Sequence, residues 1–151
     1  MIEKNLNKLK KPCKMVKSLD ESVIITNRLF EILSNTKNGV GLAANQIGID
    51  KRVCVINVSR PIALVNPEII EFDGRIIFEE ACLSFPGEVV ITERYRNITV
   101  VASNLAEPLC FGGSTDFLEC VCVQHEIDHL NGITMHDRAV DRVDIMGVGV
   151  F

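Results

Sequence analysis

The sequence lacks the long apolar segments of secreted and membrane-spanning proteins. Roughly the first thirty residues contain no uninterrupted apolar run, so no signal peptide is predicted. Glu3 and the absence of arginine before Arg28 argue against a transit peptide, and no stretch approaches the length of a membrane span. We therefore expect a protein of a reducing cytoplasm that makes no membrane contact.

Aromatic side chains are also scarce, at 5% of the sequence, and none lies among the lysines near the N-terminus. A net charge of −4 argues against a chain that chiefly neutralises phosphates. Because stacking on single-stranded nucleic acid requires aromatic residues, we interpret the lysine cluster as a solvated basic face and expect no sequence-specific nucleic-acid partner. The cluster comprises Lys4, Lys8, Lys10, Lys11, Lys14 and Lys17.

The sequence shows no internal repeat, low-complexity segment or linker, and a chain of 151 residues is ordinarily one domain. We therefore predict a single domain over residues 1–151. Six cysteines would fit a disulfide framework in a small secreted protein, but without a secretory signal we expect free thiols. Cys54, Cys120 and Cys122 lie among valine and isoleucine residues and are predicted to be buried in the core.

Two helices are indicated, one in each half of the chain. Residues 18–21 have the Ser-x-x-Glu form of a capping box, and a helix is predicted from there to the polar residues 35–38. Its expected apolar face comprises Leu19, Val23, Phe30 and Leu33. Apolar residues and histidines recur at helical spacing over residues 115–130, and Gly132 supplies a stop.

Short strands are predicted between the two helices. Four segments are rich in β-branched residues and are separated by Asn-Pro, Asp-Gly and Arg-Asn turns. They are residues 53–58, 62–65, 75–78 and 98–102. The predicted fold class is therefore α+β, with short antiparallel sheets around a central late helix and one N-terminal helix.

The late helix contains His125-Glu126-Ile127-Asp128-His129, a His-Glu-x-x-His pattern. Residues four apart return to nearly the same helical face, so both imidazoles can bind one metal ion. Glu126 is displaced around the helix, which suits it to carry a proton rather than to bind the ion. Asp128 points the other way, and we expect it to be an ordinary solvent-facing or capping carboxylate.

Two residues compete as the third protein ligand that a catalytic metal site requires. His136 would complete a metzincin-like peptidase, but it arrives one residue late for the pattern His-Glu-x-x-His-x-x-Gly-x-x-His. Cys82 lies in a β-like segment just before the turn signal Pro86-Gly87, and a thiolate is a strong ligand for a transition metal. A buried structural thiol is the alternative reading of Cys82.

A third segment, residues 39–46, reads Gly-Val-Gly-Leu-Ala-Ala-Asn-Gln. Its glycines permit close approach of the backbone to a ligand, and Gln46 can present an amide NH₂ as a hydrogen-bond donor. The segment also matches the Gly-x-Gly-x-x-Ala form of dinucleotide-binding proteins. That reading fails because a predicted helix and polar turn precede the glycines and no acidic residue follows at the required distance.

Together the three segments resemble the peptide deformylase family. Its signatures are Gly-x-Gly-x-Ala-Ala-x-Gln, Glu-Gly-Cys-x-Ser and Gln-His-Glu-x-Asp-His, and the matching residues here are 39–46, 80–84 and 124–129, in the same order. The resemblance implies a metal-dependent hydrolase that removes the N-formyl group from N-formylmethionyl peptides of nascent proteins. It also implies one divalent transition metal, Fe²⁺ in the cell, with Zn²⁺, Ni²⁺ and Co²⁺ as alternatives that the same ligands accept.

The resemblance also implies roles for individual residues. Glu126 would act as general base and then as general acid. Gln46 and the backbone N–H of Leu83 would stabilise the oxyanion, and Gly41 would line the formyl end of the cleft. The implied metal ligands are Cys82, His125 and His129.

Two features depart from the family pattern. Ala81 replaces the glycine before the ligand cysteine and adds a methyl group where the substrate backbone is expected to pass, so the resemblance does not fix the substrate affinity or the peptide preference. Many bacterial members of the family have a C-terminal helix with which they dock on the ribosome. The residues after Gly132 are too few and too rich in glycine to form that helix. In this respect the sequence is similar to truncated, phage-encoded members. We therefore expect a monomer with at most weak ribosome docking, acting in a bacterial cytoplasm or, if phage-encoded, in the host cytoplasm.

The residues near His125 on the late helix also indicate which substrate side chain the site accepts. Leu118, Val121 and Cys122 lie on or near the helical face that bears His125 and are expected to line an apolar pocket for methionine. Because formyl is the smallest acyl group, acetylated peptides are expected to react far more slowly. Two alternative functions remain open, a peptidase that uses His136 and a catalytically idle binder of chain N-termini.

Overall fold

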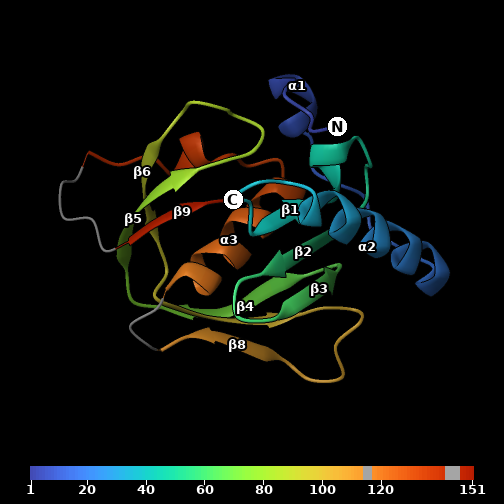
Figure 1. The fold of residues 1–151 in the computed structure, drawn as a ribbon. Helices are drawn as coiled ribbons and strands as arrows, with labels where there is room; N and C mark the ends of the chain where they lie inside the picture. The colour runs from blue at the N-terminus through green and yellow to red at the C-terminus, as the bar shows by residue number, and fades with distance from the viewer. Residues whose placement is uncertain (114–116, 142–146) are drawn as a thin grey trace.

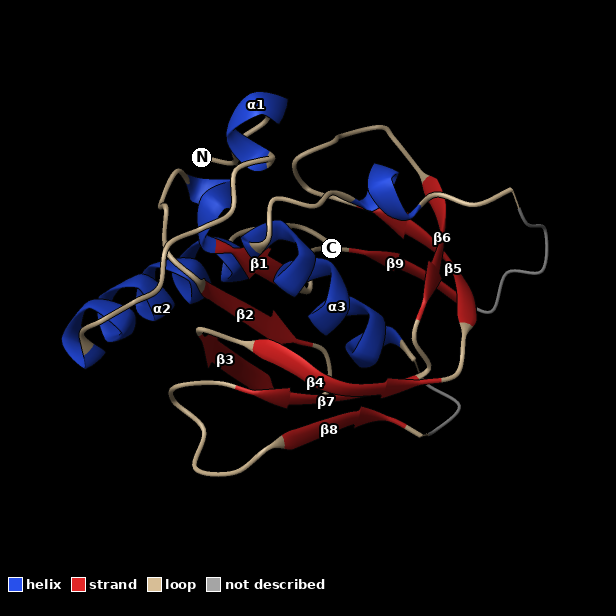
Figure 2. Ribbon diagram, turned by 180° about the vertical axis from the view of Figure 1, so that it is seen from behind, coloured by secondary structure: helices blue, strands red, loops and turns tan. Residues whose placement is uncertain are grey.

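A computed structural model describes residues 1–113, 117–141 and 147–151. Three small sheets surround one buried helix, as Figures 1 and 2 show from opposite sides. This is the α+β arrangement that the sequence predicts, and that prediction is confirmed. The elements are α1 (Leu6–Leu9), α2 (Leu19–Ser34), β1 (Gly41–Ala43), η1 (Ala44–Ile47), β2 (Val53–Asn57), β3 (Pro61–Val65), β4 (Glu68–Asp73), β5 (Ile76–Ala81), β6 (Val90–Arg94), β7 (Asn97–Val101), β8 (Leu109–Gly112), α3 (Leu118–Leu130), η2 (Met135–Arg138) and β9 (Gly147–Val150).

The strand orders of the three sheets are β1-β2-β3, β4-β7-β8 and β6-β5-β9. The four predicted strands correspond to β2, β3, β5 and β7, whereas β1, β4, β6, β8 and β9 were not predicted. The expectation of antiparallel sheets is wrong at one pair, because β9 runs parallel to β5. The single turn of α1 likewise adds a second helix to the N-terminal region.

α2 begins where the capping signal places it. The Ser18 hydroxyl accepts a hydrogen bond from the backbone N–H of Glu21 at 3.3 Å. The predicted apolar face is wrong at Leu19 and Val23, which are 73% and 51% exposed, whereas its member Leu33 is buried. The helix packs on β1 and β2 through a face rotated away from Leu19 and Val23, comprising Ser22, Ile25, Leu29 and Leu33.

α3 lies at the centre of the molecule, and every residue from Cys120 to Leu130 is buried. A helix enclosed on all sides is normally apolar all round, yet the buried residues of α3 include Gln124, His125, Glu126, Asp128 and His129. Buried polar groups are costly unless they are hydrogen-bonded or bind an ion. The partners of these side chains therefore define the candidate site.

Gly132 ends α3, as the sequence predicts. Its φ of +74° is left-handed, and it donates its N–H to His129 O at 3.0 Å while Ile133 donates to Asp128 O at 2.9 Å, which is the Schellman pattern. A Cβ at this position would lie 2.5 Å from Lys10 O, so glycine also lets the N-terminal segment cross the helix end. Of the predicted helix start, residues 115 and 116 lie outside the described residues.

The cysteines are free thiols, and Cys54, Cys120 and Cys122 are buried in the core around α3, as predicted. Within residues 1–113, 117–141 and 147–151, no helix combines the length and the apolarity that crossing a bilayer requires.

Candidate metal centre

Cys82, His125 and His129 bring three possible ligand atoms together in the interior. Cys82 directly follows β5, and the two histidines lie one turn apart on α3. The Cys82 Sγ atom is 3.4 Å from His129 Nε2, which is 3.2 Å from His125 Nε2. All three ligand atoms lie within 4.8 Å of one another, and all three side chains are buried.

These separations fit a transition-metal ion. Metal–nitrogen bonds of about 2.0–2.1 Å and metal–sulfur bonds of about 2.3 Å, at tetrahedral angles, place two nitrogens about 3.3 Å apart and nitrogen and sulfur about 3.6 Å apart. The observed separations of 3.2 and 3.4 Å are close to these values. One sulfur with two imidazole nitrogens is also a ligand set suited to Fe²⁺, Zn²⁺, Ni²⁺ and Co²⁺.

Glu80 orients the ring of His125. Its Oε1 lies 2.8 Å from His125 Nδ1, so Nδ1 carries the proton and Nε2 keeps its lone pair toward His129. Burial alone would raise the pKa of Glu80, but Arg94 and His125 together hold it well below its usual range. Glu80 is therefore a permanent anionic acceptor at neutral pH.

A chain of ion pairs continues from Glu80. Arg94 donates to both carboxylate oxygens of Glu80, at 2.7 and 2.8 Å, and to Asp128 at 2.6 Å. Asp128 also accepts two bonds from Arg138, each 2.9 Å long. The expectation that Asp128 faces solvent is therefore wrong, because it is 7% exposed and two arginines from outside α3 hold it.

Glu80, Arg94 and Arg138 have no role among the predictions from the sequence. Glu80 could have been found, because it lies two residues before Cys82 in the second motif. Arg94 carries no local signal. Only the antiparallel register of β5 and β6, which pairs Ile76 with Arg94, places its side chain on the same sheet face as Glu80.

Glu126 is fully buried, and its Oε1 has no hydrogen-bond partner among the described residues. Burial and the charge of Glu80 raise the pKa of Glu126 well above its ordinary value, against a smaller opposing effect of Arg94. A Cβ on Gly41 would lie 2.5 Å from Glu126 Oε2 and 2.6 Å from Cys122 Sγ. Gly41 therefore leaves the space that the Glu126 carboxylate occupies.

Gln46 connects the first motif with the second. Its Oε1 accepts from the backbone N–H of Ala43 at 2.9 Å, which turns the amide NH₂ toward Ser84 Oγ at 3.1 Å and Cys82 Sγ at 3.7 Å. The NH₂ group thus faces the candidate metal centre.

The backbone N–H of Leu83, the other expected oxyanion donor, is already engaged. It donates to the backbone oxygen of Phe151 at 2.7 Å.

His136 lies outside the cluster. Its Nε2 is 2.9 Å from Glu88 Oε1, and its ring packs edge-on against Phe85 with the centroids 4.6 Å apart. The group of convergent ligand atoms contains Cys82 and not His136. This position gives no support to a metzincin-like site.

A known protein family matches most of the chain. The model of the polypeptide deformylase family matches residues 2–144. The chain belongs to the peptide deformylase family. It is a hydrolase that removes the N-formyl group from nascent peptides, as members of this family do.

Individual deformylases show how close the likeness is. The deformylase of Heliobacterium modesticaldum is 48% identical over 111 residues, which cover 73% of this chain and 72% of that protein. The crystal structure of the Thermotoga maritima deformylase matches with a TM-score of 0.81 at 36% identity, over 93% of this chain and 97% of that one. A Synechococcus elongatus deformylase in complex with actinonin matches with a TM-score of 0.81 at 32% identity, over 93% and 78%.

The ligand geometry generates a first prediction, on metal content. Cys82→Ala removes one of the three convergent ligand atoms, so the metal bound per chain should fall at least about tenfold. His136→Ala is the matched control, since it removes an imidazole outside the cluster, and it should retain the metal. Elemental analysis of protein prepared without oxygen measures both. The reverse result would show that the third ligand is misassigned.

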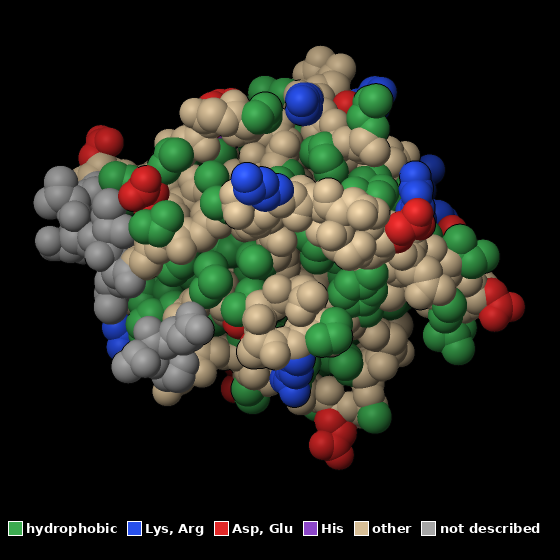
Figure 3. Space-filling view, in the orientation of Figure 1, with side chains coloured by type: hydrophobic (Ala, Val, Ile, Leu, Met, Phe, Trp, Pro, Cys, Tyr) green, Lys and Arg blue, Asp and Glu red, His purple; other side chains and the backbone are tan. Residues whose placement is uncertain are grey.

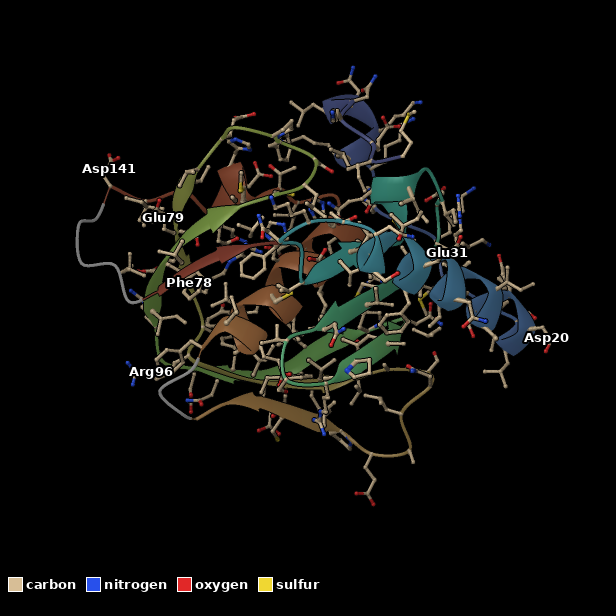
Figure 4. The ribbon with its side chains drawn as sticks, in the orientation of Figure 1. Asp20, Glu31, Phe78, Glu79, Arg96 and Asp141 are labelled. Carbon is tan, nitrogen blue, oxygen red and sulfur yellow. The ribbon has the colours of Figure 1, made fainter. Side chains whose placement is uncertain are left out.

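A second prediction concerns Glu80→Gln, which keeps the shape of the side chain but removes its charge. Metal affinity should fall about 10–100-fold, because the proton on His125 Nδ1 loses its anionic acceptor. Glu79→Gln is the control. Glu79, which is labelled in Figure 4, is the neighbouring residue on β5, and successive side chains of a strand point to opposite faces of the sheet. Competition with a chelator gives the two dissociation constants. Equal constants would contradict the proposed orientation of His125.

Proposed function

We propose that this deformylase holds one divalent transition metal on Cys82, His125 and His129 and hydrolyses N-formylmethionyl peptides with Glu126 as the proton carrier. One observation supports the proposal above all others. Three ligand atoms converge at separations that suit a metal ion. Close to them in the chain is the fully buried carboxylate of Glu126, one oxygen of which has no hydrogen-bond partner in the part of the chain that the structure describes.

The bound ion would be Fe²⁺ in the cell, with Zn²⁺, Ni²⁺ or Co²⁺ as alternatives. When bound, such an ion supplies a Lewis acid that polarises the formyl carbonyl and acidifies water. Burial and the nearby carboxylate of Glu126 raise the pKa of the Cys82 thiol. A cation in the site would offset both effects by stabilising the thiolate.

Glu126 would carry the proton through the reaction. It accepts a proton from the water whose oxygen bonds to the formyl carbon, and it then donates that proton to the departing amine nitrogen as the C–N bond breaks. Formate and a free amino terminus result. The raised pKa of Glu126 supports both roles, since a carboxyl group that titrates nearer neutrality is a better acid and base there. An idle binder of chain N-termini would have no use for this buried base.

Gln46 and Leu83 would stabilise the negative charge that develops on the formyl oxygen. A preorganised donor of this kind is typically worth about 3 kcal/mol in the barrier. The Gln46 NH₂ group already faces Cys82, whereas the Leu83 N–H can serve only after its bond to Phe151 opens. Gly41 would keep the formyl end of the site small.

Partner and location follow from the substrate. We propose that the chain forms a single catalytic domain and acts as a monomer on nascent chains in the cytoplasm of a bacterial cell. We further propose that any docking on the ribosome is weak; after Gly132 the structure describes η2 and β9. We also propose that actinonin, which the Synechococcus elongatus deformylase binds, binds here.

The role of Glu126 yields a third prediction. Glu126→Ala should retain the metal but lose about 10²–10⁴-fold in turnover of a formyl-Met peptide, because it removes the proposed proton carrier. The control is Glu119→Ala on the same helix, whose carboxylate bonds to Ser59 at 2.5 Å and should be dispensable. Formate release and metal content are measured together. If Glu126→Ala binds the metal and turns over as fast as the unaltered protein, Glu126 is not the proton carrier.

The small space at Gly41 generates a fourth prediction, on the acyl group. Formyl-Met peptides should be hydrolysed, acetyl-Met peptides should react at least about tenfold more slowly because of the added methyl group, and internal peptide bonds should survive. Formate, acetate and new peptide ends are measured with one preparation of metal-loaded protein. Acetate release as fast as formate release, or internal cleavage, would exclude the proposed specificity.

A further inference from the structure

We propose that residues 147–151 occupy the substrate site of their own chain and must leave before a formylated peptide can bind. The inference rests on the proposed function, because it takes the candidate metal centre as the place of hydrolysis. It goes beyond that function by assigning the deformylase an internal competitor.

The backbone of this segment pairs with the edge of β5 to which an extended substrate peptide would add. β6 covers one edge of β5, and β9 covers the other, in parallel register from Phe78↔Gly147 to Ala81↔Val150. A strand edge with free N–H and C=O groups binds extended peptides by adding them to the sheet. Because β5 leads directly to Cys82, a peptide on this edge would reach the metal centre. In both Figure 1 and Figure 2 the end of β9 lies between β5 and β1, beside α3.

Phe151, the last residue of the segment, already accepts a hydrogen bond from the proposed oxyanion donor, the backbone N–H of Leu83. Phe151 donates its N–H to Ala81 O at 2.7 Å, and its own backbone oxygen accepts from Leu83 N–H at 2.7 Å. A formyl oxygen would need the same Leu83 N–H in the transition state. The two oxygens cannot both take a full hydrogen bond from one N–H, so the bound segment and productive substrate exclude each other.

The side chain of Phe151 fills the pocket predicted for methionine. The ring is fully buried, with its centroid 5.2 Å from that of His125 and 6.1 Å from that of Phe78. It belongs to the same core cluster as Val121 and Cys122, with Leu118 packed against it. No histidine of the described residues is visible on the face drawn in Figure 3, in agreement with the burial of His125.

Two glycines allow this close fit. A Cβ on Gly149 would lie 2.5 Å from Phe151 Cζ and 2.7 Å from Leu118 Cδ1. A Cβ on Gly147 would collide with the ring of Phe78, which extends from β5 beside β9 (Figure 4). Val148 between them is 64% exposed. The segment therefore places bare backbone against the site and a valine side chain toward solvent.

The first experiment removes the occupying ring with Phe151→Ala in the metal-loaded protein. If only the open fraction of molecules binds substrate, the apparent affinity is reduced by that fraction. The KM for a formyl-Met tripeptide and the Kd for actinonin should therefore both fall about tenfold, with kcat changed by less than about twofold. Val148→Ala, on the same strand but facing solvent, should leave all three constants unchanged.

A second variant displaces the segment without deleting the ring. Gly147→Ala should push β9 away from Phe78 and lower both KM and Kd in the same direction as Phe151→Ala. It decides the question should Phe151→Ala fail to fold. A synthetic peptide Gly-Val-Gly-Val-Phe should restore inhibition of Phe151→Ala in trans, and the inhibition should be competitive with substrate.

Amide hydrogen exchange supplies a readout that needs no turnover. In the unaltered protein, actinonin should accelerate exchange of the backbone amides of residues 147–151. Protection that persists with actinonin bound, together with unchanged or raised KM in both variants, would overturn the proposal and make the segment a fixed part of the fold. Accelerated exchange without any formate release would instead uphold the internal competitor and overturn the proposed function.

Discussion

The hydrogen bond between His125 Nδ1 and Glu80 is the contact on which the rest of the site depends. It joins β5 to α3, and it determines which ring nitrogen faces the other ligand atoms. Arg94 anchors Glu80 and also reaches Asp128 on the same helix, so α3 is tied to the sheet at two places. The strand that leads to Cys82 and the helix that bears both histidines are thereby held at separations suited to a metal ion.

The same contact separates the chemistry of two neighbouring carboxyl groups. Arg94 and His125 hold the pKa of Glu80 low, whereas burial and the charge of Glu80 raise the pKa of Glu126. Opposite shifts of this kind assign different roles to two acids in one site. Glu80 remains an anion that orients a ligand, and Glu126 is free to exchange a proton. Removing Glu80 would therefore disturb both the metal and the base.

A feature of the fold or of the site could be predicted from the sequence where it depends on residues close together in the chain. The start of α2 at Ser18, the stop at Gly132 and the facing histidines of α3 follow from contacts within a few residues, so the sequence predicts them. The partners of Asp128 do not, because Arg94 lies on a strand whose register is set by another strand. The prediction that Leu19 and Val23 lie on the buried face of α2 failed for a related reason. Burial depends on which part of the helix contacts the sheets, and both of these side chains in the first turns are exposed. Segments of alternating small residues, such as β9, carry too little hydrophobic signal to be recognised as strands.

The position of β9 also bears on Ala81, which replaces the glycine of the family motif. Ala81 pairs with Val150, and its backbone oxygen accepts the N–H of Phe151. An extended chain can therefore lie along this edge with the alanine methyl present, so the substitution does not by itself block the addition of a substrate strand. Its effect should be confined to the side chains that pass nearest to Ala81, on β9 as well as on a substrate. A substitution of Ala81 would then change the binding of residues 147–151 and the binding of the substrate together. The observed KM would depend on the difference between these two binding free energies rather than on either one alone.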